Sequence, residues 1–348
     1  MAIKIQRFIV KIKTGSVPDH ISVHFKSQGL WIGLLTIKVW IPPDAAIICA
    51  ASARRNVCTS EGTLDQNVID LYDQYTHSSM GRIEFLRRLA KLAGGAAAAN
   101  AMLPFIDVDE AGPGQVTVDE PGLILEHTAF AGPDGEIMAY TARPADNKQR
   151  GGVVVVHENR GLNAHIEDVA RRLAKAGFIA LAPDALSPLG GTPGDRDEAR
   201  SMIGGLDRAA TLRLFLASLD MLRDHAQGNG KVGCVGFCWG GGMVNQLAVN
   251  DPRLNAAVSF YGRQADAADV PNIKARLMLH YAGLDRRINA GIDGYRAALD
   301  QHKIDYDLFM YDGANHAFHN DTAPTRYDEA AAKLAWKRTL ELFGKTLL

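Results

Sequence analysis

The stretch Lys231-Val-Gly-Cys-Val-Gly-Phe-Cys-Trp-Gly240 decides the expected fold. Its first half is the short apolar run of a buried strand, and a helical stretch follows from about Gly241. Between the two, Gly-x-Cys238-x-Gly is typical of a nucleophile elbow, a sharp strand-to-helix turn that exposes its central side chain. The flanking glycines remove Cβ clashes, and a helix N-terminus favours a thiolate. Cys238 is therefore the candidate nucleophile.

Other interpretations of this stretch fit less well. A phosphate-binding loop would carry a following lysine or the pattern G-x-G-x-x-G, and neither is present here. A buried structural cysteine is the second alternative. That role suits Cys234 better, because it lies inside the apolar strand, where a small buried hydrophobe is expected.

Residues 116–348 alternate apolar strand-like runs with helical stretches, and this alternation predicts a mainly parallel sheet covered on both faces. The first two strands flank Gly132-Pro-Asp-Gly135, which favours a hairpin. The pattern as a whole predicts an α/β-hydrolase fold with eight strands. These are Leu123–Phe130, Ile137–Ala142, Val153–His157, Ile179–Ala182, Val232–Gly236, Ala256–Tyr261, Leu277–Tyr281 and Tyr306–Tyr311.

A cysteine nucleophile needs a base and a group that orients the base. In this fold the acid and then the histidine follow the nucleophile, each just beyond the end of a strand. Asp285 and His316 occupy those two places and are the candidates. His319 is the alternative base, whereas His280 lies within a strand and is expected to be packed.

The loop after the strand Val153–His157 reads His157-Glu-Asn-Arg-Gly-Leu-Asn163. Its backbone can supply half of an oxyanion hole, and the residue after the nucleophile supplies the other half. The backbone N–H groups of Asn159 and Trp239 are therefore predicted to bind the oxyanion. Glu158 taken alone is interpreted as a solvated loop carboxylate.

Composition and charge narrow the function classes. The net charge of −1 gives no electrostatic reason to expect nucleic acid or an acidic membrane surface as a partner. Four cysteines in 348 residues do not form a disulfide framework, and no second Cys/His pair completes a zinc site, so no metal is expected. The apolar segment Leu30–Ala51 contains Lys38, two prolines and Asp44, which argues against a membrane span.

Three zones are predicted along the chain. Residues 1–63, with eight basic against three acidic side chains, form an apolar and basic extension that we interpret as lying outside the native protein. Residues 64–115 are a helical, alanine-rich leader or linker, and 116–348 are the catalytic domain. Arg82–Arg87 resembles a twin-arginine export signal, but Ile83 replaces the second arginine. A cytoplasmic location is expected, with periplasmic export as the alternative.

The site residues together resemble the dienelactone hydrolase family, whose type activity is carboxymethylenebutenolidase. The resemblance covers roughly 130–345 and is carried by H-E-N-R-G-L-N, G-F-C-W-G-G, the strand end at Asp285 and G-A-N-H-A-F. It implies a Cys-His-Asp triad of Cys238, His316 and Asp285. It also implies that Glu158 controls the protonation of the thiol.

The sequence departs from the family where the substrate's carboxylate would bind. The family uses two arginines there, and Asn320 stands in place of one of them, four residues after His316. Arg196 or Arg200 is the candidate for the other, and Arg326 could substitute. The expected function is hydrolysis of a small ester or lactone by a monomer or homodimer, without a cofactor. A general carboxylesterase or thioesterase, and a non-catalytic or redox-sensing relative, are the alternatives.

Overall fold

The computed structural model describes residues 21–27, 30–37, 64–78, 80–106 and 114–348, with the backbone alone for 21–27 and 30–37. Contacts within the chain define two compact units. The larger one consists of Ile69–Phe85 and Met102–Leu348. The other holds an antiparallel hairpin of β1 (Ile21–Ser27) and β2 (Leu30–Ile37). Most predictions for 1–63 fall outside the described residues.

An eight-stranded sheet forms the centre of the larger unit, in the order β10-β9-β8-β7-β5-β6-β4-β3. Six strands are parallel, and β3 and β4 form the antiparallel hairpin at one edge, joined by Gly132 and Gly135. The predicted α/β-hydrolase fold is thereby confirmed. The strands are β3 (Leu123–Gly132), β4 (Gly135–Pro144), β5 (Arg150–Val156), β6 (Ile179–Pro183), β7 (Gly228–Phe237), β8 (Ala256–Phe260), β9 (Arg276–Ala282) and β10 (Tyr306–Tyr311).

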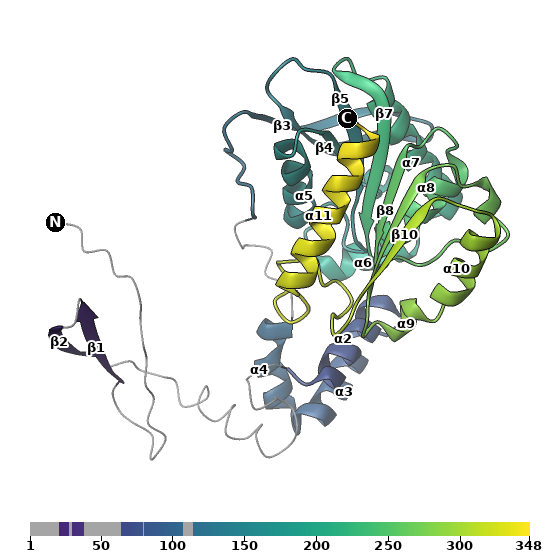
Figure 1. Cartoon of the computed structure of the whole chain (residues 1–348). Coiled ribbons are helices and arrows are strands. Elements are labelled where there is room, and N and C mark those ends of the chain that lie inside the picture. The colour runs from purple at the N-terminus through teal and green to yellow at the C-terminus, as the bar shows by residue number, and fades with distance from the viewer. Residues whose placement is uncertain (1–20, 28–29, 38–63, 79, 107–113) are drawn as a thin grey trace. The chain divides into compact units, whose positions relative to one another are not determined.

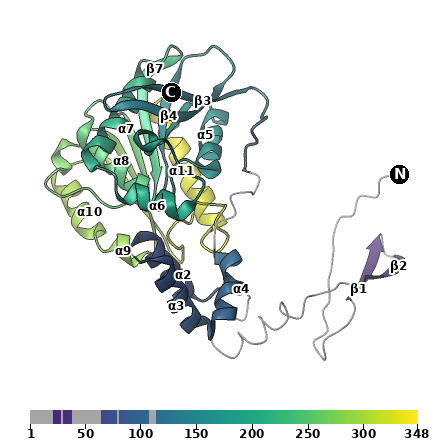
Figure 2. The same cartoon turned by 180° about the vertical axis from the view of Figure 1, so that it is seen from behind.

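Helices cover both faces of the sheet, because its central strands are apolar on both sides (Figures 1 and 2). The helices α5 (Ala164–Lys175) and α11 (Glu329–Thr346) pack on one face. The other face carries α6 (Arg196–Gly204), α7 (Arg208–Arg223), α8 (Trp239–Asn250) and α10 (Ile292–Gln301). Because the six central strands are parallel, their carboxyl ends lie at one common edge of the sheet. The loops that carry the candidate residues lie at this edge.

Residues 64–115 are more helical than the sequence analysis expected. They form α2 (Gln66–His77), α3 (Arg82–Ala93) and α4 (Ala96–Ile106), so the alanine run predicted as a linker is the start of a helix. The part of α2 from Ile69 onwards belongs to the same compact unit as the sheet. The boundary at 116 thus stays a prediction, and residues 69–85 belong to the same compact unit as the sheet.

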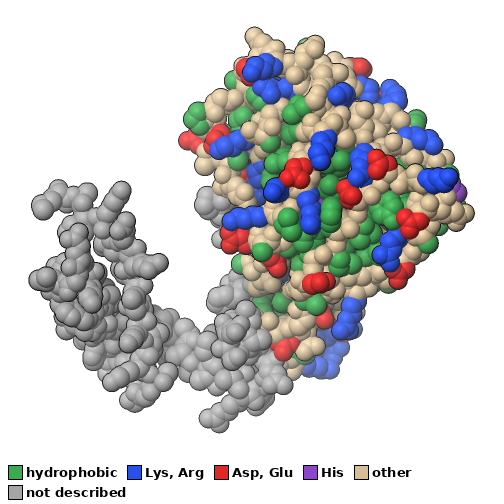
Figure 3. Space-filling model, in the orientation of Figure 1, with side chains coloured by type: hydrophobic (Ala, Val, Ile, Leu, Met, Phe, Trp, Pro, Cys, Tyr) green, Lys and Arg blue, Asp and Glu red, His purple; other side chains and the backbone are tan. Residues whose placement is uncertain are grey.

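The described helices are too short or too polar to cross a bilayer. On the face of the molecule shown in Figure 3, basic and acidic side chains are interspersed, as the balanced net charge leads one to expect.

Candidate active site

Cys238 lies at the turn between β7 and α8, with φ 57° and ψ −114°, in a region that non-glycine residues rarely adopt. Tight packing around the turn explains its glycines. A Cβ on Gly236 would lie 2.3 Å from the carbonyl oxygen of Gly240, and one on Gly240 would lie 2.4 Å from that of His157. The backbone N–H of Cys238 donates to Phe260 (3.0 Å), which fixes the turn to β8. This geometry is that of a nucleophile elbow.

Asp285 and His316 form a hydrogen-bonded pair beside this turn. Asp285 follows β9 and caps α9 (Arg286–Asn289) by accepting from the N–H of Ile288 at 3.1 Å. Its other oxygen accepts from His316 Nδ1 at 2.5 Å. The Nε2 side of His316 therefore faces the sulfur, and its donor atom lies within 4.8 Å of Cys238 Sγ. The structure brings together all three residues predicted from strand ends.

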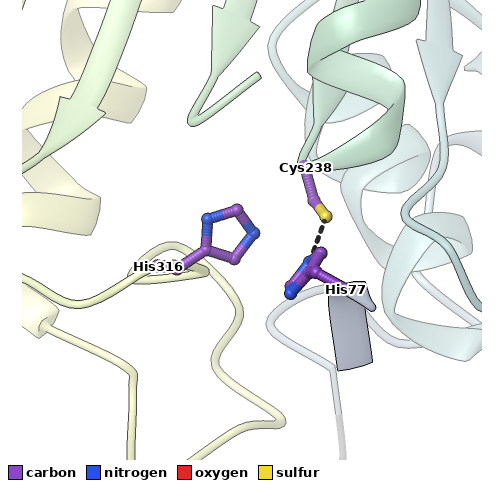
Figure 4. Close-up of side chains that lie close together, drawn as sticks. All are labelled: His77, Cys238 and His316. Carbon is purple, nitrogen blue, oxygen red and sulfur yellow. Dashed lines mark hydrogen bonds between the residues drawn. The ribbon is translucent and has the colours of Figure 1, made fainter. Parts of the chain in front are cut away.

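A second histidine, which no sequence pattern singled out, reaches the same sulfur. His77, the last residue of α2, places Nε2 3.0 Å from Cys238 Sγ (Figure 4). Its Nδ1 donates to the backbone oxygen of Asp73 at 2.8 Å and lies 3.0 Å from that residue's carboxylate. Asp73 and His77 are four residues apart on a helix and therefore lie on one face. This spacing is the feature of the sequence that could have indicated an aspartate–histidine pair. Nothing in the sequence showed that this face meets Cys238.

The charges of the cluster favour a thiolate. Burial opposes ionisation of Cys238, but the neighbouring His77 and His316 lower the pKa of its thiol to about 6. Burial likewise opposes the charged form of His316, yet Cys238, Asp73 and Asp285 raise its pKa to about 10. The pKa of His77 is also raised, chiefly by Cys238 acting against burial. Near neutral pH these shifts favour a thiolate beside a protonated His316, and they favour the charged form of His77 as well.

The other predicted histidines serve packing. His319 is buried with its ring 5.0 Å from those of Phe237 and Phe260, and this burial depresses its pKa far below the usual value. His280 lies in β9, where its Nδ1 is 3.0 Å from the Tyr311 hydroxyl. Neither ring has the orienting carboxylate that His316 has in Asp285.

Glu158 is buried in the loop after β5 and accepts from Asn320 Nδ2 at 2.8 Å. The side chain of Asn159 donates to the carbonyl oxygen of Thr76 in α2 at 2.7 Å. Trp239 is the first residue of α8, so its N–H has no acceptor within the helix. The oxyanion hole of the Asn159 and Trp239 amides stays a prediction, and these positions are compatible with it.

A small cavity of about 20 Å³, open to solvent, lies beside Cys238. Its lining contains two of the three predicted arginines, Arg196 and Arg326, together with Asn320. Arg200 points elsewhere: it donates to the carbonyl oxygen of Tyr75, and its guanidinium lies 4.4 Å from that ring's centre. The lining residues are Tyr72, Thr76, His77, Glu158, Asn159, Arg160, Asn163, Arg196, Cys238, His316, Ala317, Asn320 and Arg326.

The donor atoms of His77, Cys238 and His316 lie within 4.8 Å of one another, a grouping that could also admit a soft cation. The contact of 3.0 Å between Sγ and Nε2 is a hydrogen-bond distance, and both Nδ1 atoms face carboxylates. We interpret the three groups as a cluster that shares protons.

The fold and the elbow define the class: an α/β-hydrolase with its nucleophile position occupied by cysteine. The sequence model of the dienelactone hydrolase family matches residues 137–347, and the chain belongs to that family. It is a dienelactone hydrolase-like hydrolase. A second model, described as YqhI-like, matches residues 59–95.

Individual relatives agree with this assignment. The "Putative carboxymethylenebutenolidase" of Escherichia coli O157:H7 is 32% identical over 247 residues, covering 66% of this chain and 89% of the relative. The "Putative hydrolase fragment YghX" of Escherichia coli K12 is 50% identical over 91 residues, or 25% of this chain and 78% of the relative. Among solved structures, a dienelactone hydrolase-like promiscuous phosphotriesterase from metagenomic libraries has 27% identity and a TM-score of 0.60, covering 65% of this chain and 100% of that one.

Proposed function

We propose that the chain hydrolyses a small ester or lactone, with Cys238 as nucleophile, His316 as acid and base, and Asp285 as the group that orients His316. The observation that carries this proposal is the hydrogen bond of 2.5 Å between His316 and Asp285, formed beside a cysteine in the elbow conformation. A carboxylate on Nδ1 presents Nε2 to the reacting atoms, which is what acyl transfer requires.

In the proposed mechanism the Cys238 thiolate attacks the ester carbonyl, and the amides of Asn159 and Trp239 stabilise the oxyanion. Protonated His316 then gives its proton to the leaving alkoxide, which departs as the alcohol. Neutral His316 next takes a proton from water as that water attacks the thioester. The acid is released and the thiolate is regenerated, so the cycle consumes one water.

The cavity supports a substrate that carries a carboxylate of its own. Arg196 and Arg326 line the cavity and offer positive charge, and a charge-assisted hydrogen bond to a carboxylate contributes about 1.5–3 kcal/mol. Asn320, which stands where the family has an arginine, instead donates to Glu158. We therefore propose that the substrate's carboxylate meets Arg326 and Arg196, and that Asn320 orients Glu158.

A substrate panel tests the proposal. Lactones, p-nitrophenyl esters and acyl thioesters would be compared with wild-type protein and with Cys238→Ala. We expect turnover of activated esters and lactones, a burst of released p-nitrophenol in the wild type, and no burst in the variant. Full activity of Cys238→Ala would refute the assignment of the nucleophile. Preference for thioesters would favour the thioesterase alternative.

We also infer that residues 69–85 remain with the hydrolase in the working protein, which favours the cytoplasmic location over export with cleavage of a leader. Arg82, from the twin-arginine-like segment, lies 3.3 Å from the carboxylate of Asp197 in α6, and Tyr75 donates to the same carboxylate at 2.6 Å. Fractionation of cells followed by mass spectrometry would test this inference. Recovery of the periplasmic protein without these residues would contradict it.

A further inference from the structure

Cys238 is approached by two aspartate–histidine pairs rather than one. His316 is oriented by Asp285 from the loops after β10 and β9, whereas His77 Nδ1 donates to the backbone oxygen of Asp73 within α2 and lies 3.0 Å from that residue's carboxylate. Of these two rings, that of His77 lies at direct hydrogen-bond distance from the sulfur, at 3.0 Å. The two rings lie edge to face with their centres 4.6 Å apart (Figure 4). His77 therefore touches the reacting atom and meets the description of a catalytic residue.

The end of α2 is held in place by contacts on several sides. Asn159, from the oxyanion loop, donates to the carbonyl oxygen of Thr76, and the Tyr75 hydroxyl donates to Asp197. The guanidinium of Arg326 lies 5.1 Å from the centre of the Tyr72 ring. A second arginine, Arg287, places its Nε 3.6 Å from the Asp73 carboxylate. These contacts come from four separate loops and helices, so the position of His77 is specified rather than accidental.

His77 lies outside the segment that defines the family. The dienelactone hydrolase model covers 137–347, whereas the YqhI-like model covers 59–95. The triad residues predicted from strand ends all lie in the first segment, and His77 and Asp73 lie in the second. This chain thus joins residues from two separately recognised segments around one sulfur.

We propose that α2 contributes His77 as a second catalytic histidine, which holds Cys238 as a thiolate while His316 handles the protons of the leaving group and of water. This proposal rests on the proposed function for its role in turnover. With Nδ1 directed at Asp73, Nε2 is the atom that accepts the proton of the thiol. His77 then stays protonated through the cycle and balances the charge of the sulfur each time it is expelled.

The proton balance distinguishes the two histidines. The thiol proton moves once, from Sγ to His77 Nε2, before the substrate binds. The proton given to the alkoxide comes from His316 and is replaced from water in the second half of the cycle. With a single histidine, the proton taken from the thiol would also have to serve the leaving group. Two histidines separate these tasks.

The test measures the rate at which iodoacetamide alkylates Cys238 between pH 5 and pH 10, followed by mass spectrometry of the peptide containing it. The experiment uses the full chain and needs no ester substrate. Besides the two pairs, the titratable or charged groups among the described residues that line the cavity or interact electrostatically with Cys238 are Glu158 and Arg160 after β5, Tyr72 in α2, Tyr261 after β8, Arg196 in α6 and Arg326 after β10. These groups are unchanged in the variants, so a shift between proteins reports on His77.

We expect His77→Gln to move the midpoint of alkylation upward by at least one pH unit and to slow alkylation at pH 6 by about fivefold or more. The rates of variant and wild type should converge near pH 10, where both thiols are ionised. Asp73→Asn should shift the midpoint in the same direction by a smaller amount. If His77→Gln does not fold, the profile of Asp73→Asn is used to test the proposal instead. His302→Ala, at an exposed site, is the matched control and should leave the profile unchanged.

Two results would overturn the proposal. One is an alkylation profile of His77→Gln that coincides with that of the wild type. The other is faster ester turnover in His77→Gln, which would mean that α2 only obstructs the nucleophile. Failure of the proposed function is seen separately, as ester hydrolysis that survives Cys238→Ala. Each failure therefore has its own readout.

Discussion

At the scale of single residues, the proposed mechanism makes the pH range of catalysis depend on the protonation states of Cys238 and His316. The reaction needs the thiolate, formed above a pKa of about 6, and protonated His316, which is lost above a pKa of about 10. We predict that kcat/KM rises as the pH passes about 6, stays level, and falls as it passes about 10. Because the groups interact, the two limbs report the cluster rather than either residue. A profile that rises only above pH 8 would contradict the thiolate resting state.

The buried contact between Asn320 and Glu158 leads to a prediction about stability. Asn320→Asp removes the N–H donor and places a second carboxylate beside Glu158, with both side chains buried. We expect the free energy of unfolding at pH 7 to fall by about 2–3 kcal/mol, as measured with urea. Asn147→Asp, on an exposed loop, is the control and should change it by less than about 0.5 kcal/mol. Equal effects in the two variants would show that the contact contributes little.

At the scale of elements, two glycines of α8 should respond in opposite ways to replacement by alanine. A Cβ at Gly240 would meet backbone oxygens of the loop after β5 at 2.4 Å, whereas at Gly242 the nearest atom is 3.5 Å away. Gly240→Ala should therefore lower the free energy of unfolding by about 1–3 kcal/mol or more and impair the elbow. Gly242→Ala should be neutral or stabilise by up to about 1 kcal/mol. Thermal unfolding and the ester burst, measured on both variants, check this pair.

The strands and helices were largely predictable, because each is specified by a local sequence pattern. The eight strands are short apolar runs with turn signals between them, and each occurs in the structure with its ends shifted by a few residues. The segment 64–115, which contains α2, was predicted to be helical, but the surface against which α2 packs was not predicted. Its apolar face carries Tyr72 and Tyr75, which the sequence alone cannot assign to a particular surface. Partners of a helix face depend on contacts between residues far apart in the chain.

At the scale of the whole molecule, the contacts described around the sulfur come from residues between Tyr72 and Arg326. We predict that a protein starting at Leu64 keeps kcat/KM within about twofold of the full chain. A protein starting at residue 79 lacks His77 and should show the alkylation profile of His77→Gln. Kinetics and circular dichroism on the two shortened proteins would test this. Loss of activity on removal of 1–63 would show that this segment belongs to the working protein.

The sequence by itself determined the sheet, the elbow at Cys238 and the places of Asp285 and His316. In this fold catalytic residues follow strand ends, and strand ends can be found from local patterns. Only the tertiary structure decided that Asn320 donates to Glu158, that Arg200 turns to Tyr75, and that His77 reaches Cys238. These contacts join residues separated by more than 100 positions. They form because the sheet and its covering helices bring distant segments together, which no local pattern encodes.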